Sequence, residues 1–223
     1  MNHTTDLPQK SLTTNAPVAI SIVDRGGSRR LEGPGISLAF ERIDGRWRHS
    51  LRATDPDRGS DLVLARSIEW DADRDDPGRV ASPVFQELQF HVDPAGVSQA
   101  LLLGMSGRHH FSAAMAMVVT ELGVEIRVAA ADRYRGEVLA VGSTYVILFE
   151  PADLVSADEA RVAWANSGLS LTMIADVATR LAIAEAGPSA TQAQALSASG
   201  SAIPTRVWNY TLTARLLPEQ TLA

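Results

Sequence analysis

Apolar and polar residues alternate along most of this chain, and this period of two predicts β-strands. The clearest example is the segment 36–43, which is followed by Asp44-Gly45 and then by a second alternating segment, 47–53. Asp-Gly readily adopts the positive φ angles of a two-residue turn, so two alternating runs around it are a strong hairpin signal. We therefore expect a β-hairpin over residues 36–53.

The same alternation continues through the middle of the chain, where turn-forming residues interrupt it at 93–96, 106–107 and 121–123. These interruptions carry the Asp, Pro, Ser and Gly residues that tight turns require. The pattern predicts five strands, over 84–92, 97–104, 110–120, 124–130 and 138–149. Because the connections are short, we expect these strands to form an antiparallel meander.

The last third of the chain has weaker signals. The sequence Ser156-Ala-Asp-Glu159 fits a capping box, which predicts a short helix that continues through Trp164. Two further alternating runs, 169–174 and 179–185, indicate a second hairpin. Residues 187–202 are rich in Ala, Ser and Gln and predict a long surface loop, whereas 207–216 alternates cleanly and predicts a closing strand.

Together these elements predict an all-β protein with one or two short helices. The fold class is a large antiparallel β-sandwich, either an open pair of sheets or a closed, supersandwich-like or barrel-like form. Residues 1–16 are polar and have no periodicity, so we expect a disordered N-terminal tail. Residues 17–223 fit a single β-sandwich domain, because all-β domains often reach this size.

Composition excludes several kinds of chemistry. The chain has no cysteine, which rules out disulfides, iron–sulfur clusters and cysteine nucleophiles. Its only lysine is Lys10 in the expected tail, which effectively excludes a Schiff-base mechanism. We find no G-x-S-x-G motif and no glycine-rich phosphate-binding pattern, so a serine hydrolase and a nucleotide-binding fold are unsupported.

Net charge and hydropathy limit the classes of partner that we expect for this protein. The net charge of −6 argues against a nucleic-acid partner, because such proteins are usually basic. No apolar run approaches the length that a membrane-spanning helix needs, so we expect no membrane partner. The N-terminal residues lack a basic segment followed by an apolar one, and we therefore expect a cytoplasmic protein.

Alternation also predicts which residues share one face of the sheet. On the strands of the meander, apolar side chains occupy one face and a partly polar set occupies the other. Small residues such as Ala114 and Ala116 on that second face leave room for a ligand. Carboxylates, imidazoles and a guanidinium beside such a space suit a small polar ligand. The candidate ligand-binding residues are Glu87, Gln89, His91, His110, Ser112 and Arg127, with Glu125 next to them.

The pair His109-His110 lies at a hairpin tip and raises the question of a metal site. Adjacent residues of a strand point to opposite faces, so the two imidazoles cannot easily bind the same ion. We therefore expect no metal and no cofactor, and we assign His110 alone to the candidate face. Nearby, an aspartate followed by arginine, Asp132-Arg133, fits either an anion-binding strand end or a solvated loop.

Three functional hypotheses are compatible with these residues. The first is a non-catalytic module that binds a small polar ligand, such as a carbohydrate, or a protein partner. The second is a carbohydrate-active epimerase or lyase that uses His91 or His110 as a base, with Glu87 or Arg127 assisting. The third is a structural protein that self-assembles into homo-oligomers. Convergence of the two histidines with Glu87 at one pocket would favour the enzyme hypothesis.

Trp47 and Trp208 lie in alternating strands, where we expect them to anchor the core.

Overall fold

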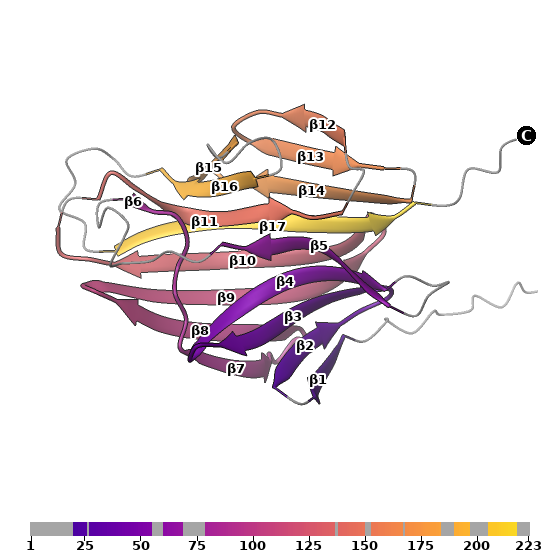
Figure 1. Ribbon diagram of the computed structural model, residues 1–223, viewed down its shortest axis with the longest axis horizontal. Helices are drawn as coiled ribbons and strands as arrows, with labels where there is room; N and C mark the ends of the chain where they lie inside the picture. The colour runs from indigo at the N-terminus through magenta and orange to yellow at the C-terminus, as the bar shows by residue number, and fades with distance from the viewer. Residues whose placement is uncertain are drawn as a thin grey trace, which may run out of the picture.

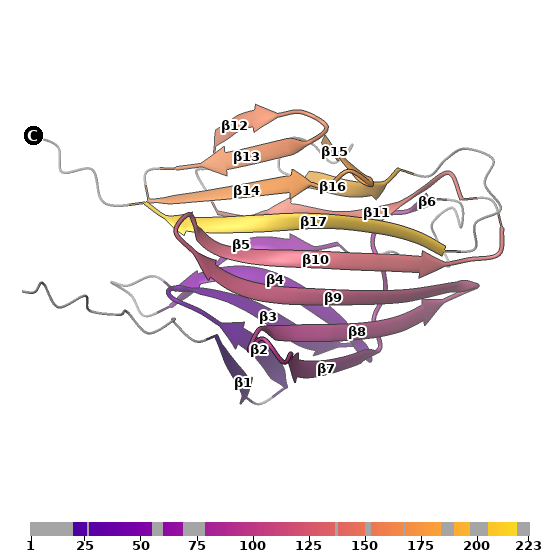
Figure 2. The same ribbon diagram turned by 180° about the vertical axis from the view of Figure 1, so that it is seen from behind.

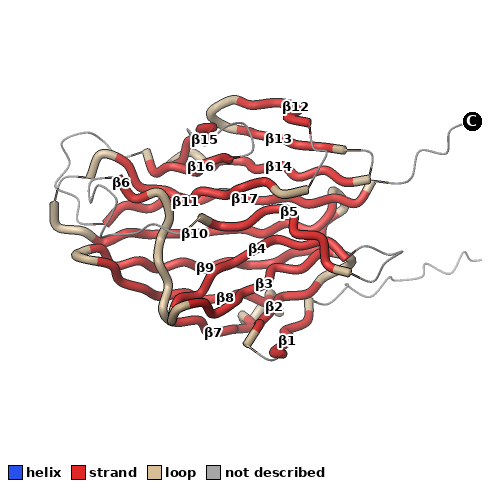
Figure 3. The backbone as a smooth tube through the Cα atoms, in the orientation of Figure 1, coloured by secondary structure: helices blue, strands red, loops and turns tan. Residues whose placement is uncertain are grey.

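The computed structural model describes residues 20–25, 27–54, 60–68, 79–136, 138–149, 153–166, 168–183, 190–196 and 205–217. These residues form two large sheets that pack face to face as a sandwich (Figure 1). The described residues contain no helix, and therefore none long and apolar enough to cross a membrane (Figure 3). The expected tail over 1–16 lies outside the described residues.

One sheet has nine strands in the order β1-β2-β3-β4-β5-β11-β16-β15, with β6 paired to β11. Its strands are β1 (Ser21–Arg25), β2 (Ser28–Glu32), β3 (Ile36–Ile43), β4 (Arg46–Thr54), β5 (Asp61–Ser67), β6 (Arg79–Val80), β11 (Ala140–Ile147), β15 (Thr179–Ile183) and β16 (Ala190–Ala195). The predicted hairpin over 36–53 is confirmed as β3 and β4. Asp44 and Gly45 at its turn have φ angles of 50° and 77°, as a two-residue turn of this type requires.

The other sheet has eight strands in the order β12-β13-β14-β17-β10-β9-β8-β7 and faces the viewer in Figure 2. Its strands are β7 (Glu87–Val92), β8 (Ser98–Ser106), β9 (His109–Thr120), β10 (Gly123–Arg133), β12 (Asp153–Ala157), β13 (Arg161–Ala165), β14 (Leu169–Ala175) and β17 (Thr205–Leu216). The meander is confirmed for β7 to β10, and β17 matches the closing strand expected over 207–216.

The structure corrects two expectations about strand pairing. The fifth strand of the predicted meander, β11, leaves the meander and joins the nine-stranded sheet between β5 and β16. The runs 169–174 and 179–185 do not form a hairpin. Their strands β14 and β15 are consecutive in the chain but belong to different sheets, so the connection between them crosses the sandwich.

Two segments have a different secondary structure from the one that the sequence predicted. The segment from Ser156 to Trp164, expected to be a helix, belongs instead to the hairpin of β12 and β13. At the turn of this hairpin, the Asp158 carboxylate accepts hydrogen bonds from the backbone N–H groups of Ala160 and Arg161. The expected surface loop over 187–202 contains β16, in which Ala190, Thr191 and Ala193 are buried. Short, weakly apolar side chains concealed that strand, because its burial comes from its neighbours in the sheet.

The apolar core fills the space between the sheets. Along β9 and β10, every second side chain points inward and is buried, as alternation predicted. Val84 and Phe85, just before β7, also belong to this core. An added Cβ at Gly104 would lie 1.8 Å from the carbonyl oxygen of Val84, so this position requires glycine. Trp208 is fully buried, as predicted, and Trp47 packs partly buried against the core.

A chain of polar side chains crosses this core and joins the two sheets. His49 Nε2 on β4 shares a hydrogen bond of 2.7 Å with the Tyr145 hydroxyl on β11. Tyr145 in turn shares one of 2.8 Å with the Tyr210 hydroxyl on β17. The indole N–H of Trp208, also on β17, donates to Ser143 Oγ on β11 at 3.0 Å. Each buried polar atom in this chain thereby gains a partner, which offsets its loss of contact with water.

Burial determines how these groups titrate. Desolvation lowers the pKa of His49 from 6.5 to about 4. It raises the pKa of Tyr210 to about 12. It also raises the pKa of Tyr145 well above its usual 10, with the neighbouring Tyr210 contributing. All three groups are therefore neutral at neutral pH, since burial disfavours each charged form.

We predict that His49 makes the protein less stable in mild acid. Unfolded His49 takes up a proton below pH 6.5, whereas folded His49 does so only near pH 4. Between these values the unfolded state binds more protons, so the free energy of unfolding falls as the pH falls, by an amount on the order of 3 kcal/mol. Urea unfolding at pH 7 and pH 4.5 measures this loss.

The control compares His49→Gln with His91→Gln, because His91 is exposed. We expect His49→Gln to flatten the decline of stability between the two pH values and His91→Gln to leave it as in the wild type. An unchanged decline in His49→Gln would contradict the assignment of this pH dependence to the buried histidine.

Candidate functional site

The polar face predicted from the sequence is the outer face of the eight-stranded sheet. Its strand register places Glu87, Leu103, Ser112, Ala131 and Val207 in one row across β7, β8, β9, β10 and β17. Inward neighbours such as Phe111 and Ala130 are buried, whereas members of the row are exposed or half-buried. The assignment of residues to faces on β7, β9 and β10 is thus confirmed.

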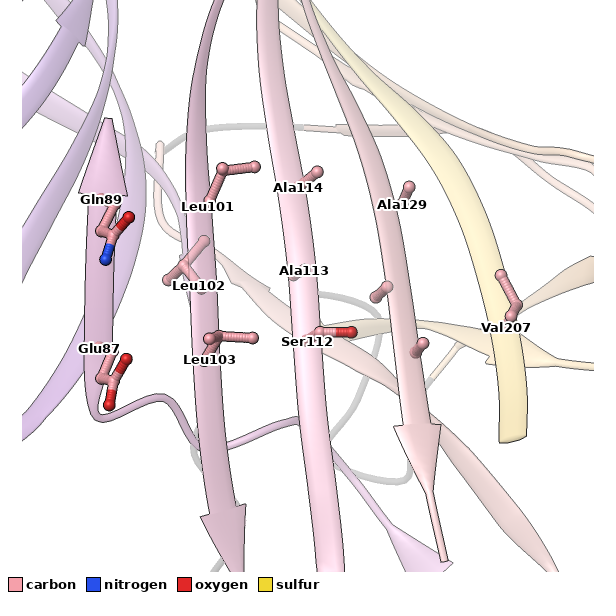
Figure 4. Close-up of a pocket in the computed structure, with 12 residues that line it drawn as sticks. Glu87, Gln89, Leu101, Leu102, Leu103, Ser112, Ala113, Ala114, Ala129 and Val207 are labelled. Carbon is pink, nitrogen blue, oxygen red and sulfur yellow. The ribbon is translucent and has the colours of Figure 1, made fainter. Parts of the chain in front are cut away.

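A hollow of about 400 Å³ lies in this face. Its floor consists of the small side chains Ser112, Ala114, Ala129 and Ala131 on β9 and β10. Figure 4 shows larger side chains on both sides of that floor, with Leu101 and Leu103 on β8 and Val207 on β17. The hollow exists because two adjacent strands carry short side chains between strands that carry long ones.

Three of the six candidate residues line this hollow. Ser112 belongs to its floor, and Glu87 and Gln89 lie on β7 beyond the leucines (Figure 4). Neither Glu87 nor Gln89 forms a side-chain hydrogen bond or ion pair with the described residues. The hollow is therefore mostly apolar, with a few polar groups at one side, which is the usual character of a small-molecule site of this volume.

A second hollow, of about 470 Å³, continues the first along the same strands. The two share Ala114 and Ala129, and the second extends to Ala116, Arg127 and Ile174. We call the two hollows together the outer groove. Arg127, the fourth candidate residue, lies at this far end, where its guanidinium donates to Glu125 Oε2 at 2.9 Å. That guanidinium is thus already paired.

The remaining candidates, His91 and His110, are exposed and line neither hollow. Strand geometry puts the backbone of His110 about 12 Å from that of Glu87 and about 22 Å from that of His91, using ~3.3 Å per residue and ~4.8 Å between strands. Hydrogen bonding between these side chains would need a separation of about 3 Å. The residues that the enzyme hypothesis requires share one face but do not converge.

His109 lies on the opposite face from His110, as alternation predicted. Its Nδ1–H donates to Asp132 Oδ2 at 2.9 Å, and both side chains are almost completely buried. The imidazole is stacked on Tyr134, with ring centroids 4.1 Å apart, and on Phe111. The histidine pair therefore consists of one ring in the core and one on the surface. No group of three or more His, Asp or Glu side chains among the described residues is arranged to hold a metal ion.

The walls of the outer groove were not foreseen. Leu101, Leu103 and Val207 are 37%, 52% and 48% exposed. Met105, the next outward residue of β8 beyond the hollows, is 55% exposed. A signal was present in the sequence, because the run Ala100-Leu-Leu-Leu103 breaks the alternation and forces apolar side chains onto both faces of β8. These apolar side chains of β8 and β17 therefore face solvent at the edges of the small-residue floor.

We predict that the two neighbouring histidines differ sharply in their effect on stability. His109→Phe keeps a stackable ring but leaves the buried Asp132 carboxylate without its donor, and we expect the free energy of unfolding to fall by about 3 kcal/mol or more. His110→Phe changes an exposed side chain and should alter it by less than about 0.5 kcal/mol. Urea unfolding compares the two variants, and equal losses would contradict the assignment of faces.

Comparison with known proteins gives no relative from which a function could be transferred: no protein-family model matches this chain, and no curated protein matches it at a significant level.

Proposed function

We propose that this protein is a non-catalytic binding protein whose outer groove holds the apolar body of a small amphipathic ligand. The observation that carries the proposal is the alanine floor between exposed leucine and valine walls. A ligand placed there would cover apolar side chains that now face water, and each buried methylene contributes about 0.8 kcal/mol. The polar residues predicted for this face favoured a small polar ligand, and the exposed leucines of β8 shift the proposal towards a ligand with an aliphatic part.

The positions of the titratable side chains support binding over catalysis. General acid–base chemistry needs a base within hydrogen-bond reach of the reacting atom and usually a second group beside it. On this face His91, His110 and Glu87 lie on strands or in rows too far apart to act on one small substrate. Arg127 lies at the opposite end of the groove from Glu87 and is paired with Glu125.

The aromatic residues favour an aliphatic ligand over a carbohydrate. A sugar ring commonly stacks on an exposed aromatic side chain. In the described part of the chain, Trp164 and Trp208 are buried and Trp47 is half-buried against the core. The side chains that line the outer groove are aliphatic or polar, apart from Tyr210 at the floor of the second hollow, which is buried.

Octanol is a suitable first probe because it is neutral and largely aliphatic. We expect it to bind the wild-type protein in isothermal titration calorimetry, and we expect Ala129→Leu to weaken binding at least about tenfold, because the new side chain fills the floor shared by both hollows. Shorter alkanols should bind about fourfold more weakly for each methylene removed.

The matched control is Ala165→Leu, because Ala165 lies on β13 of the same sheet but outside both hollows. This variant should bind octanol as the wild type does. The proposal fails if no alkanol binds the wild type, or if Ala129→Leu and Ala165→Leu bind octanol equally well.

Self-association is a second candidate function, favoured by the edge strand β12. All five of its residues are exposed, and Val155 is 65% exposed. An edge strand offers unpaired backbone groups to a second copy of the chain. However, a bulge between Leu154 and Ser156 interrupts the regular ladder, which works against continuous strand pairing.

Light scattering over a range of protein concentrations tests this second function. If β12 is an interface, the wild type forms a concentration-dependent dimer and Val155→Lys shifts it to the monomer. A monomer at every concentration would exclude assembly through β12.

A further inference from the structure

The floor of the outer groove lies between two chemically different pairs of side chains. This floor runs along β9 and β10, where the cross-strand pairs are Ser112–Ala131, Ala114–Ala129 and Ala116–Arg127. One step beyond Ser112 and Ala131, the next pair in the register is His110 and Arg133. At the other end, Arg127 is followed by Glu125. Thus a strip of small side chains separates a histidine–arginine pair from an arginine–glutamate pair.

The two side chains at the first end have no internal partner. Arg133 and His110 are both exposed, and neither side chain makes a hydrogen bond or ion pair with the described residues. Asp132 does not neutralise Arg133, because its carboxylate points to the opposite face and accepts the hydrogen bond of His109. At the other end, by contrast, two nitrogen atoms of Arg127 donate to Glu125. The positive charge available to a ligand therefore lies at the Arg133 end.

We propose that the outer groove binds an aliphatic carboxylate, with its alkyl chain along the floor towards Arg127 and its carboxylate group just beyond the floor, at Arg133 and His110. This inference rests on the proposed binding function and specifies the ligand class. The planar fork of Arg133 can donate two parallel hydrogen bonds to a carboxylate, and a ring N–H of His110 can donate a third. Met105, next to His110 in the same row, adds apolar contact at this end.

The floor has a length that suits such a chain. Ser112 and Ala116 are four positions apart on β9, which corresponds to about 13 Å of strand at ~3.3 Å per residue. The half of this path nearer to Ser112 has apolar walls, formed by Leu101, Leu103 and Val207. The half nearer to Ala116 is bordered by the polar side chains Gln99, Asn209 and Thr211. A ligand that joins a negative head to a medium-length alkyl chain therefore matches both the charge at one end and the apolar strip that follows.

Among the described residues, two acidic side chains line the outer groove, Glu87 in the first hollow and Asp176 in the second, and the first hollow is the one nearer to Arg133. Glu87 is therefore the carboxylate to consider first. It lies two strands from Ser112, with Leu103 on the intervening strand β8. Its backbone is about 12 Å from His110 by the same strand geometry, which exceeds the screening length of ~8 Å at physiological salt. The repulsion on a carboxylate at Arg133 is therefore weak, and we expect Glu87→Gln to strengthen carboxylate binding slightly.

Three probes with the same alkyl chain separate the head group from the groove: octanoate, octanol and octylamine. By isothermal titration calorimetry, we expect octanoate to bind the wild type about three- to tenfold more tightly than octanol, and octylamine to bind more weakly than octanol. Raising the salt to about 1 M, where the screening length is ~3 Å, should abolish the preference for octanoate while octanol binding persists.

Variants of Arg133 and His110 test whether the carboxylate lies at their end of the groove. Arg133→Gln should bring octanoate binding down to the level of octanol, His110→Gln should reduce the preference in part, and Arg133→Lys should retain some of it. Octanol binding should be unchanged in all three, which shows that the groove is intact. The control is Arg215→Gln, because Arg215 is exposed near the end of β17 and lies outside both hollows.

The outcomes distinguish this inference from the function on which it rests. Suppose that octanol binds and that Ala129→Leu weakens its binding. If octanoate then binds no more tightly than octanol, or still binds more tightly in Arg133→Gln, the groove remains a binding site but the carboxylate assignment is overturned. A preference that depends on Arg127 and not on Arg133 also overturns it, because the head group would then lie at the other end. If none of the three probes binds the wild type, the proposed function and this inference fall together.

Discussion

The pleat of β9 and β10 is the constraint on which the rest of this structure depends. Each strand must present one set of side chains to the core and the other to solvent, and the two sets cannot be exchanged without shifting the register. On the inner side, Phe111, Met115 and Val128 close the sandwich. The outward-facing positions between them do not have to fill the core. They are occupied by the small residues Ser112, Ala114, Ala129 and Ala131. Two adjacent strands with short outer side chains produce a hollow without any irregularity in the backbone.

Local signals in the sequence determine how much of this can be predicted. The hairpin at Asp44-Gly45 and the meander from β7 to β10 follow from turn chemistry and alternation, because both depend on residues that are close in the chain. Alternation also separates His109 from His110 correctly. The same local reasoning fails where pairing is non-local: it cannot tell that β14 and β15 belong to different sheets, since that depends on β17 and β16. It fails for β16 as well, whose small residues are buried by neighbouring strands.

The turn between β12 and β13 shows why the predicted helix was wrong. An aspartate that accepts hydrogen bonds from the next backbone N–H groups serves a helix N-terminus and a tight turn equally well. Asp158 performs that role at the hairpin, and the residues that follow decide the outcome. Val162 and Trp164, two residues apart, both belong to the hydrophobic core cluster, as alternate residues of a strand can. For the candidate site, sequence reasoning found residues at the edges of the groove but missed its walls. β8 was interpreted as a strand without an assignment of its two faces.

The polar chain through the core has a consequence for how the two sheets lie on each other. An interface of aliphatic side chains is tolerant, because similar contact can be made after a small sliding of one layer over the other. The bonds Tyr145–Tyr210 and Trp208–Ser143 join β11 of one layer to β17 of the other at two points. A displacement of a few ångströms would break both hydrogen bonds and leave their polar atoms without partners in an apolar interior. Two fixed points define a single alignment of the layers, and with it the position of β17 and the Val207 wall that it carries.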